Sequence, residues 1–330
     1  MPELPEVETV RRGLAPALEH AIVVKADVRR PDLRFPFPDD LQGLLEGARI
    51  TSLSRRAKYL LIELDRDQTL IAHLGMSGSY RVETLHEAVV PERNRARETK
   101  DTFSGHMLRS KEERSLSDGQ ASTPGIFHHE RSDLGAHDHL VLDVDGGQIG
   151  PARIIYNDPR RFGFVLATPT ATLHEHKMLR DLGPEPMGNS LTPEYLADRF
   201  AGRSQPMKAA LLDQSHVAGL GNIYVCEALN RAKISPKRQA KTLVTKSGKP
   251  TDRLVALTKI IREVISEAIE AGGSSLRDHK QTDGSLGYFQ HRFSAYDREH
   301  AGCANEGCRG TITRIVQSGR STFYCPTCQR

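Results

Sequence analysis

The stretches CANEGC at residues 303–308 and CPTC at residues 325–328 decide the fold of the C-terminal end of this chain. Four thiolates arranged as Cys-x4-Cys and Cys-x2-Cys suit a tetrahedral Zn2+ ion. The residues between the two pairs alternate as strands do and flank a turn at 317–320, which predicts a β-hairpin with Arg320 near its tip. So small a unit lacks a core of its own, and we expect the metal to hold it together.

Cysteine fills all four ligand positions of this site, which favours a structural ion over a catalytic one. We therefore predict one structural Zn2+ per chain, with Cys303, Cys308, Cys325 and Cys328 as ligands. The fifth cysteine, Cys226, stands apart, and an odd count argues against a disulfide framework. A zinc ribbon with a basic tip more often faces nucleic acid, although many ribbons bind proteins.

The charge is distributed unevenly along the 330 residues. Residues 201–330 contain 20 Lys and Arg against 11 Asp and Glu, whereas residues 1–200 contain 26 against 31. A basic C-terminal part indicates a polyanionic partner, most commonly nucleic acid, and scattered solvated lysines are the simpler alternative. No apolar run approaches the ~20 residues that span a bilayer. The acidic N-terminus is unlike a signal peptide, so we expect a cytoplasmic protein without a membrane partner.

The region preceding the cysteines has the pattern of a helical domain. Thr192 is a predicted N-cap, and Ser204 is expected to cap a helix over residues 207–213. The segment QSHVAGLGN at 214–222 joins this helix to a second one, and its glycines allow a backbone to approach another group closely. The free amides at the start of the second helix would suit a phosphate. A long amphipathic helix over 251–271 then ends at two glycines.

The N-terminal half has the pattern of a β domain. A turn at 73–78 presents Met76, and another at 157–163 carries Arg160 and Phe162. Paired arginines with an exposed aromatic suit a surface that faces DNA, while an Asp-Pro turn with a core Phe is equally acceptable. The predicted strands are 21–28, 59–64, 69–74, 139–144, 153–156 and 162–167.

The chain begins Met1-Pro2-Glu3-Leu4-Pro5-Glu6. Removal of Met1 would leave Pro2 with a free secondary amine, which can attack an electrophilic carbon and form an iminium. An α-amino group has a pKa near ~7.7–8.0, so a useful fraction is neutral at pH 7. Glu3 and Glu6 place two carboxylates beside this amine. Taken alone, an ordinary acidic helix start is the better interpretation, and the rest of the chain reverses that preference.

Seven stretches together resemble the formamidopyrimidine-DNA glycosylases of bacterial base-excision repair. They are MPELPEVET (1–9), RRAKYLL (55–61), HLGMSG (73–78), DPRRFG (158–163), GLGNIY (219–224), GYF (287–289) and RSTFYCPTC (320–328). They run from the first residue nearly to the last, and as a set they are highly specific. Three departures from the family pattern are the long 86–136 segment, the Cys-x4-Cys spacing and Lys233 where a glycine is common.

The resemblance implies an α+β fold with DNA bound in a cleft between domains. The first expected part is an N-terminal β-sandwich domain with flanking helices over 1–170, which includes a disordered insertion at 86–136. A linker at 171–190 leads to a helix–two-turn–helix DNA-binding domain over 191–295, with a lesion-recognition loop at 272–289. The last part is a four-cysteine zinc finger over 296–330.

The resemblance also implies the chemistry. Pro2 would attack the sugar C1′ of a damaged purine nucleotide, and Glu3 would assist departure of the base or opening of the sugar. The resulting iminium acidifies the C2′ proton and permits β- and δ-elimination. Lys58 resembles the lysine that assists elimination and contacts phosphate. Arg320 resembles the arginine that holds the phosphate at the lesion and assists δ-elimination. No soluble cofactor is needed.

By the same analogy, the wedge that fills the gap left by the extruded base consists of Met76, Arg160 and Phe162. Extruding a base costs a few kcal/mol, and such a wedge would offset part of that cost. Further expected DNA contacts are Asn222, which would bind backbone phosphate, Lys208 near it, and Arg203 and His137.

We therefore expect a bifunctional DNA glycosylase/AP lyase that excises 8-oxoguanine and formamidopyrimidines from duplex DNA, and that also acts on abasic sites. It would be a monomer, located in the bacterial cytoplasm and associated with the nucleoid through DNA. One alternative is an enzyme similar to endonuclease VIII that acts on oxidised pyrimidines, against which Leu4 and the Arg160/Phe162 pair argue. An alternative of another class is a zinc-ribbon DNA-binding protein without catalysis.

Overall fold

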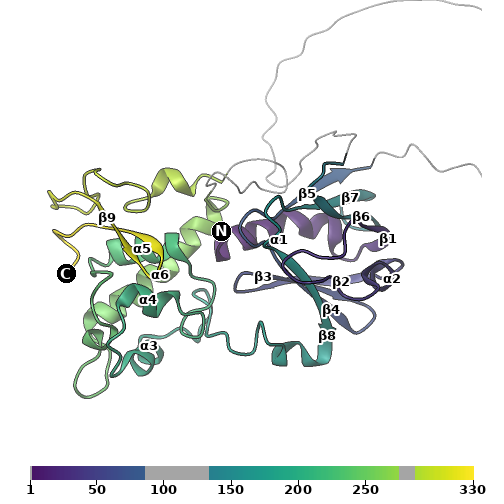
Figure 1. The fold of residues 1–330 in the computed structure, drawn as a ribbon. Coiled ribbons are helices and arrows are strands. Elements are labelled where there is room, and N and C mark those ends of the chain that lie inside the picture. Colours follow the sequence, from purple (N-terminus) through teal and green to yellow (C-terminus); the bar gives the residue numbers. More distant parts are fainter. Residues whose placement is uncertain (1, 86–133, 275–286) are drawn as a thin grey trace, which may run out of the picture.

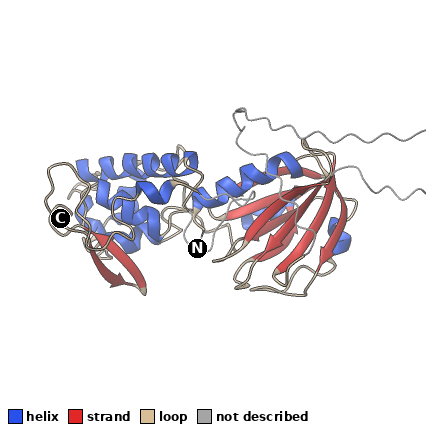
Figure 2. Ribbon diagram, turned by 90° about the horizontal axis from the view of Figure 1, so that it is seen from above, coloured by secondary structure: helices blue, strands red, loops and turns tan. Residues whose placement is uncertain are grey.

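The structure is a computed structural model that describes residues 2–85, 134–274 and 287–330. The insertion expected at 86–136 lies outside the described residues apart from its last three. Most of the loop expected at 272–289 also lies outside them. The described chain forms two lobes that lie side by side, one rich in strands and one rich in helices (Figure 1 and Figure 2). No helix among these residues is long and apolar enough to cross a membrane.

The N-terminal lobe is a sandwich of two antiparallel four-stranded sheets, with strand orders β1-β6-β7-β5 and β2-β3-β4-β8. This confirms the predicted β-sandwich. The six predicted strands appear with ends shifted by a few residues, and β2 and β5 complete the two sheets. The strands are β1 (Ile22–Val28), β2 (Ile50–Arg56), β3 (Tyr59–Leu64), β4 (Gln68–His73), β5 (Ser79–Thr84), β6 (Asp138–Asp145), β7 (Ala152–Asn157) and β8 (Phe164–Pro169).

Helix α1 (Leu4–Leu18) packs on this sandwich and leads to the other lobe. Val7, Val10 and Leu14 recur with helical spacing and are buried in the same apolar cluster as the strands. Leu4, one turn earlier, belongs instead to the apolar core of the helical lobe. The first turn of α1 therefore lies where the two lobes meet. A short helix, α2 (Leu41–Leu45), packs beside β1.

The helical lobe is built from α3 (Pro193–Phe200), α4 (Met207–Leu212), α5 (Asn222–Arg231) and α6 (Asp252–Glu270). Thr192 and Thr251 cap α3 and α6, because their hydroxyls accept from the amides of Tyr195 and Leu254. Three short 3-10 helices complete the helical elements of the described chain: η1 (Thr170–Glu175), η2 (Ala240–Leu243) and η3 (Phe289–Arg292).

The expected cap at Ser204 is wrong. The helix begins after Pro206, and its first amides are satisfied by a neighbouring segment rather than by a hydroxyl. The amide of Met207 donates to the carbonyl of Arg238 at 2.7 Å, and that of Lys208 donates to the carbonyl of Pro236. The Ser204 hydroxyl instead accepts from the Lys241 ammonium.

The predicted hairpin is β9 (Thr313–Gln317) with β10 (Arg320–Tyr324), which packs on α5. Ser318 and Gly319 form its two-residue turn, and both have positive φ, as the tight primed turns of hairpins require. A small apolar cluster that includes Ile312, Phe323 and Cys325 lies beneath it. The domain boundaries deduced from the sequence stay a prediction.

Candidate active site

Glu3 lies at the start of α1, and its carboxylate is buried against the start of α5. One carboxylate oxygen, Oε1, accepts from the amide of Ile223 at 3.0 Å. The other, Oε2, is buried and has no hydrogen-bond partner among the described residues. Gly221 makes this approach possible, because a Cβ at that position would lie 2.2 Å from the Glu3 carboxyl carbon. The sequence predicted a close backbone approach at these glycines, and the group approached is Glu3.

The position of Glu3 changes its acidity. Burial raises the pKa of its carboxyl from 4.5 to about 7, Lys58 opposes the rise, and the neighbouring Glu6 carboxylate adds to it. A substantial fraction of Glu3 is therefore protonated at neutral pH. A protonated carboxyl with an oxygen that no described residue engages can donate a proton to a leaving group or a sugar oxygen.

Glu6 holds the N-terminal segment in place. Its carboxylate accepts from the Glu3 amide at 2.8 Å and from the Tyr224 hydroxyl on α5. It also accepts from the amide and hydroxyl of Ser274, at 2.8 and 2.9 Å. Glu6 therefore joins α1, α5 and the segment that follows α6. Sequence reasoning noted Glu6 as a charge beside the amine and missed this role, because no spacing in the sequence connects residues 6, 224 and 274.

Lys58 reaches the same place from the N-terminal lobe. It follows Ala57, which has a φ of 53° in the two-residue turn between β2 and β3. The Lys58 ammonium is buried and donates to the carbonyl of Leu220 at 2.8 Å. Burial lowers its pKa, Glu3 opposes the decrease, and Arg320 adds to it. Lys58 therefore lies within electrostatic range of both Glu3 and Arg320, and the catalytic roles expected of these three residues stay predictions.

A network of charges supports the turn that carries Lys58. The Arg55 guanidinium binds Glu8 of α1 at 3.1 Å and Glu185 at 2.8 Å. Glu185, from the segment between the lobes, also accepts from the Ala57 amide at 2.6 Å. These side chains are largely buried, so the pairs are shielded from solvent. No motif in the sequence indicates that Glu185 supports the lysine.

Arg320 is exposed at the first position of β10. The residue after it, Ser321, is held from the helical lobe: its carbonyl accepts from Asn222 Nδ2 at 2.9 Å and from Lys208 Nζ at 3.0 Å. Asn222 Oδ1 is buried and has no partner within the described part of the chain. Lys208 is only 1% exposed. The phosphate contact expected of Asn222 and the DNA contact expected of Lys208 stay predictions.

The three wedge residues come together at one surface. Gly75 packs against the backbone of Phe162 and Gly163: a Cβ on Gly75 would lie 2.3 Å from the carbonyl carbon of Phe162 and from the nitrogen of Gly163. The turn that carries Met76 therefore packs directly on the turn that carries Phe162. Met76 and Phe162 are 36% and 43% exposed, and the Arg160 guanidinium lies 5.1 Å from the Phe162 ring centroid. Phe162 is therefore not the core residue that the simpler alternative required.

Asp158 organises this wedge from below. It is fully buried; one carboxylate oxygen accepts from the Ser77 hydroxyl at 2.6 Å and the other from the Gly163 amide at 2.8 Å. The Ser77 hydroxyl in turn accepts from the Arg160 amide. Asp158 thus joins both turns, and the sequence marked it only as part of an Asp-Pro turn.

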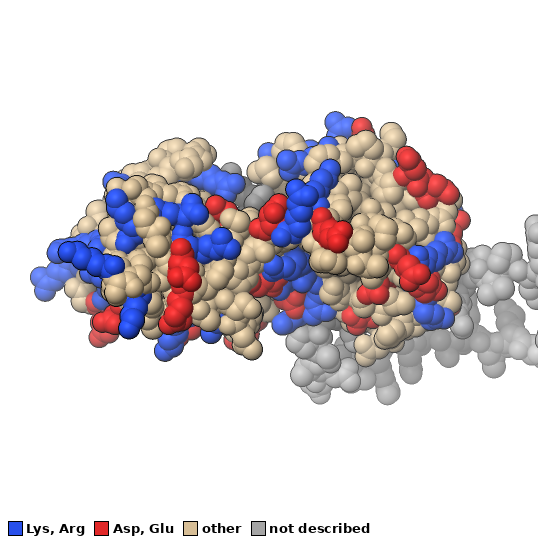
Figure 3. Space-filling model, turned by 90° about the horizontal axis from the view of Figure 1, so that it is seen from below, with Lys and Arg blue, Asp and Glu red and all other residues tan. Residues whose placement is uncertain are grey.

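The two remaining predicted DNA contacts lie in different lobes. His137 is exposed beside the wedge turn, and its carbonyl accepts from the Asp158 amide. Arg203 is exposed in the helical lobe and donates to the carbonyl of Arg199. Their roles stay predictions. On the face drawn in Figure 3, lysine and arginine side chains are spread over both lobes, with acidic ones among them.

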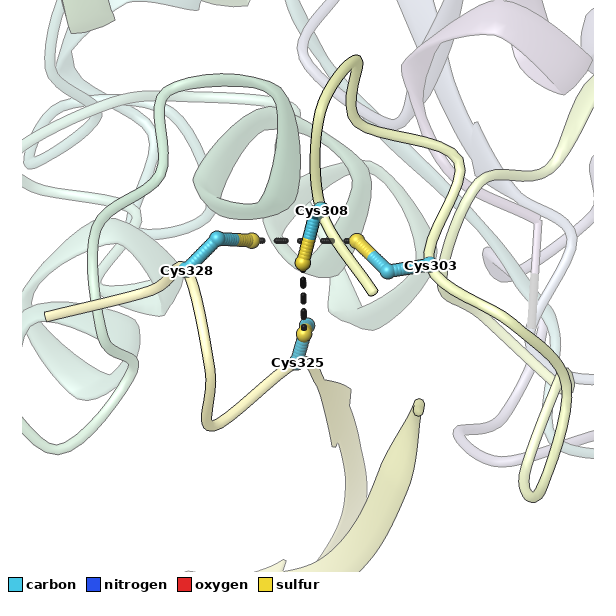
Figure 4. A group of neighbouring side chains, drawn as sticks. All are labelled: Cys303, Cys308, Cys325 and Cys328. Atoms are coloured by element: carbon cyan, nitrogen blue, oxygen red, sulfur yellow. Dashed lines mark hydrogen bonds between the residues drawn. The ribbon is translucent and has the colours of Figure 1, made fainter. Parts of the chain in front are cut away.

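The four predicted zinc ligands converge. Their sulfur atoms all lie within 4.8 Å of one another, with Cys303–Cys328 and Cys308–Cys325 at 3.7 Å (Figure 4). A tetrahedron with Zn–S bonds of about 2.3 Å has edges of about 3.8 Å, so the cluster fits one zinc ion. Asn305, from the longer first pair, donates to Cys328 Sγ at 3.4 Å and to the carbonyl of Asn230 at 3.0 Å. The extra residues therefore connect the cluster to α5.

Comparison with protein families matches three parts of the chain. The formamidopyrimidine-DNA glycosylase N-terminal domain matches residues 1–165, and the helix–two-turn–helix domain of the same family matches residues 182–280. A zinc finger found in these glycosylases and in isoleucyl-tRNA synthetase matches residues 306–330. Proteins named formamidopyrimidine-DNA glycosylase from Rhizobium meliloti and Agrobacterium fabrum are 57% and 55% identical, with full coverage of both chains.

Solved structures give the same result. A Lactococcus lactis protein in complex with an abasic-site DNA has a TM-score of 0.74 at 29% identity, with 99% of each chain covered. A protein from Thermus thermophilus has a TM-score of 0.72 at 32% identity and covers 99% of this chain and 98% of its own. The similarity therefore extends over both lobes and the zinc finger.

Proposed function

The chain belongs to the formamidopyrimidine-DNA glycosylase family of DNA repair enzymes, and on that premise we propose that it excises oxidised purines from duplex DNA and then cuts the strand. The substrates would be 8-oxoguanine and formamidopyrimidines. The observation that carries the proposal is the Glu3 carboxyl, buried beside the N-terminal residue, with a pKa of about 7 and one oxygen without a partner among the described residues.

The reaction starts at Pro2, which is buried next to Glu3. After removal of Met1, the neutral proline nitrogen forms a bond to the sugar C1′ as the bond from C1′ to the base breaks. Glu3 gives up its proton to the departing base or the sugar ring oxygen. The proline nitrogen then loses its proton, the bond from C1′ to the ring oxygen breaks, and that oxygen takes up a proton. The product is an iminium between Pro2 and an opened sugar, and its positive charge acidifies the proton at C2′.

Strand cleavage follows from that acidity. Loss of the C2′ proton breaks the C3′–O bond, and a second elimination breaks the C5′–O bond, so a phosphate leaves at each step. Lys58 would stabilise charge here. Its ammonium lies close to Glu3 and its lowered pKa lets it exchange protons more easily, which supports this role. Arg320 would hold the phosphate in the second step.

The wedge explains how the base reaches this site. A base inside the duplex is inaccessible, and extruding it costs a few kcal/mol. Met76 and Phe162 are apolar side chains exposed at one surface, and Arg160 adds a cation over the Phe162 ring. Inserted into the duplex, they would fill the gap and contact the unpaired partner base.

The choice of purines follows the relatives. A mutant of the Lactococcus lactis protein has been crystallised with DNA containing formamidopyrimidine-dG, and the wild-type protein with DNA containing an oxidised pyrimidine. An activity for oxidised pyrimidines is therefore the second candidate. We further propose a monomer that acts in the bacterial cytoplasm.

Borohydride trapping tests the proposal. The protein is mixed with duplex oligonucleotides containing 8-oxoguanine, a formamidopyrimidine, an oxidised pyrimidine or an abasic site, and borohydride is added to reduce any iminium. We expect a covalent adduct with the abasic duplex, and excision faster with both purine lesions than with the pyrimidine.

Matched variants define the outcome. Pro2→Gly keeps an N-terminal amine but loses the secondary one, and we expect it to lose most of the adduct while its fold and zinc content persist. DNA binding without any adduct from the wild type would favour the non-catalytic zinc-ribbon protein instead. Preference for the pyrimidine lesion would establish the second candidate.

A further inference from the structure

Lys208 is a buried cation in α4 whose ammonium contacts the zinc-finger hairpin. Its side chain is only 1% exposed, and Nζ donates to the Ser321 carbonyl at 3.0 Å and to the Thr322 hydroxyl at 2.5 Å. Thr322 is itself fully buried. Both acceptors belong to β10 and directly follow Arg320, so Lys208 binds the strand next to the residue that carries the arginine side chain.

The Lys208 ammonium links α4 to β10, and burying its charge has an unfavourable desolvation free energy. Taking a charge out of water costs several kcal/mol, and two neutral acceptors offset only part of that cost. Burial accordingly lowers the pKa of Lys208, and the nearby Arg320 cation lowers it further. A leucine or methionine would fill the same space without this penalty but could bond neither acceptor, so the ammonium supplies a link that packing alone does not.

The hairpin needs a polar anchor at this point. Its apolar support lies at the other end, where Phe323 and Cys325 join the cluster near the cysteines. Toward the tip, a cavity of about 200 Å³ separates α4 from the turn, lined by Pro206, Lys208, Ala209, Leu212, Gln317 and Ser318. Polar bonds therefore hold the start of β10: those of Lys208, and that of Asn222 to the same Ser321 carbonyl.

We propose that Lys208 is a positioning residue that fixes Arg320 at the lesion phosphate by clamping β10, without contacting DNA itself. This differs from the DNA contact that the sequence suggested for Lys208. It rests on the proposed function, in which Arg320 assists the second elimination. The consequence is selective: loss of the clamp slows δ-elimination and leaves the chemistry of Pro2 and Glu3 intact.

The test compares Lys208→Met, which keeps the length of the side chain and removes its charge, with Lys208→Arg and the exposed control Lys246→Met. On abasic duplex DNA, we expect Lys208→Met to lower the rate of δ-elimination relative to β-elimination about tenfold or more, because a misplacement of about 1 Å has effects of this size. The borohydride adduct should form at the wild-type rate within about twofold, and Lys208→Arg should recover part of the ratio.

Salt dependence separates a clamp from a phosphate contact. Affinity for duplex DNA with a stable abasic analogue is measured against salt concentration, and loss of one phosphate contact would reduce the slope by about one. The comparison is made in Arg320→Ala protein, where the contact of Arg320 itself is absent, and we expect addition of Lys208→Met to leave the slope unchanged. A further reduction of that slope by about one, or an unchanged ratio of elimination products in Lys208→Met alone, would overturn the inference.

Thr322→Val serves as a second variant, because it removes one acceptor with little change in volume and leaves the lysine in place. It should shift the product ratio in the same direction by a smaller factor, and an unchanged ratio in this correctly folded variant would also contradict the clamp. Absence of an adduct from the wild type would instead contradict the proposed function, so the two failures are distinguishable.

Discussion

At the scale of single residues, the raised pKa of the Glu3 carboxyl is a consequence of burial. One oxygen is held by the Ile223 amide, which alone would favour the ionised form, yet desolvation dominates and raises the pKa to about 7. Lys58 is close enough to oppose this rise but does not cancel it. The result is a carboxyl that holds its proton near neutral pH.

This acidity predicts the pH dependence of base excision. Because Glu3 must be protonated, single-turnover excision of 8-oxoguanine should decline as the pH rises through about 7. The amine must be neutral, so the rate should also decline toward low pH. Glu3→Gln should lose about a hundredfold or more in excision and keep cleavage of abasic sites. Excision that stays constant from about pH 6 to pH 9 would contradict the assignment, since that range spans both pKa values.

The same shift has a stability consequence of defined sign. The folded-state pKa lies above the unfolded value of 4.5, so ionisation penalises the folded protein increasingly from pH 4.5 to about pH 7. Urea titrations should therefore show Glu3→Gln gaining stability relative to wild type over that interval, by up to about 3 kcal/mol. A difference between the two proteins that does not change with pH would contradict the raised pKa.

Gly221 is the second residue with a sharp prediction. A methyl group there would meet the Glu3 carboxyl at 2.2 Å, so Gly221→Ala must displace the carboxylate or the start of α5. We expect base excision to fall about a hundredfold with the circular dichroism spectrum unchanged. The matched control is Gly302→Ala, whose Cβ would have nothing within 4 Å among the described residues. Equal activity of the two variants would show that Glu3 is not confined as described.

Sequence motifs predicted the charged groups of the site and missed the backbone that holds them. Pro2, Glu3 and Lys58 follow from short motifs, because catalysis demands particular side chains. The Leu220 carbonyl that binds Lys58 and the Ile223 amide that binds Glu3 are backbone groups. Any residue type would provide them, so the sequence does not reveal these contacts. For Lys208 the sequence suggests a DNA contact, and only the structure shows that its ammonium is buried and bonded to β10.

At the scale of elements, the wedge depends on two turns held together by one carboxylate. Asp158 binds Ser77 in the first turn and the Gly163 amide in its own. Asp158 is fully buried and accepts hydrogen bonds from both turns, so its loss would leave buried donors without partners. The hydrogen bonds of Asp158 thus hold the two turns in the arrangement that exposes Met76 and Phe162.

Asp158→Asn should loosen this arrangement selectively. The amide cannot accept from both turns equally, and we expect a loss of about 1–3 kcal/mol in unfolding free energy. Cleavage of abasic sites in duplex DNA should fall several-fold, while cleavage in single strands, which needs no wedge, should remain. The exposed Asp181→Asn serves as control. An equal loss on both substrates would refute a role in the wedge.

Secondary structure was predictable where a periodic pattern and a clear boundary signal agreed. The long helix α6 and six strands of the sandwich showed both signals, and the structure confirms them. The predicted cap of α4 is wrong because its first amides bind residues 236 and 238, a tertiary contact that leaves no local trace. Strand β2 has weak alternation, and α2 is only five residues long, so neither stands out in the sequence.

At the scale of the whole molecule, the N-terminus is the joint between the lobes. Leu4 belongs to one apolar core and Val7 to the other, and Glu6 binds groups from α5 and from Ser274. The first turn of α1 therefore contacts both lobes, and Figure 1 draws the start of the chain between them. The sequence predicted the N-terminal amine as the nucleophile. It did not predict the groups packed around the first turn of α1, because they come from segments far apart in the chain.

The identity of the group bonded to DNA tests this account most directly. The borohydride-reduced adduct with abasic DNA is digested with trypsin, and mass spectrometry locates the modified residue. We predict that the sugar fragment is on Pro2, in a peptide that lacks Met1 and ends at Arg11. An adduct on Lys58, or full activity in protein that retains Met1, would contradict the account.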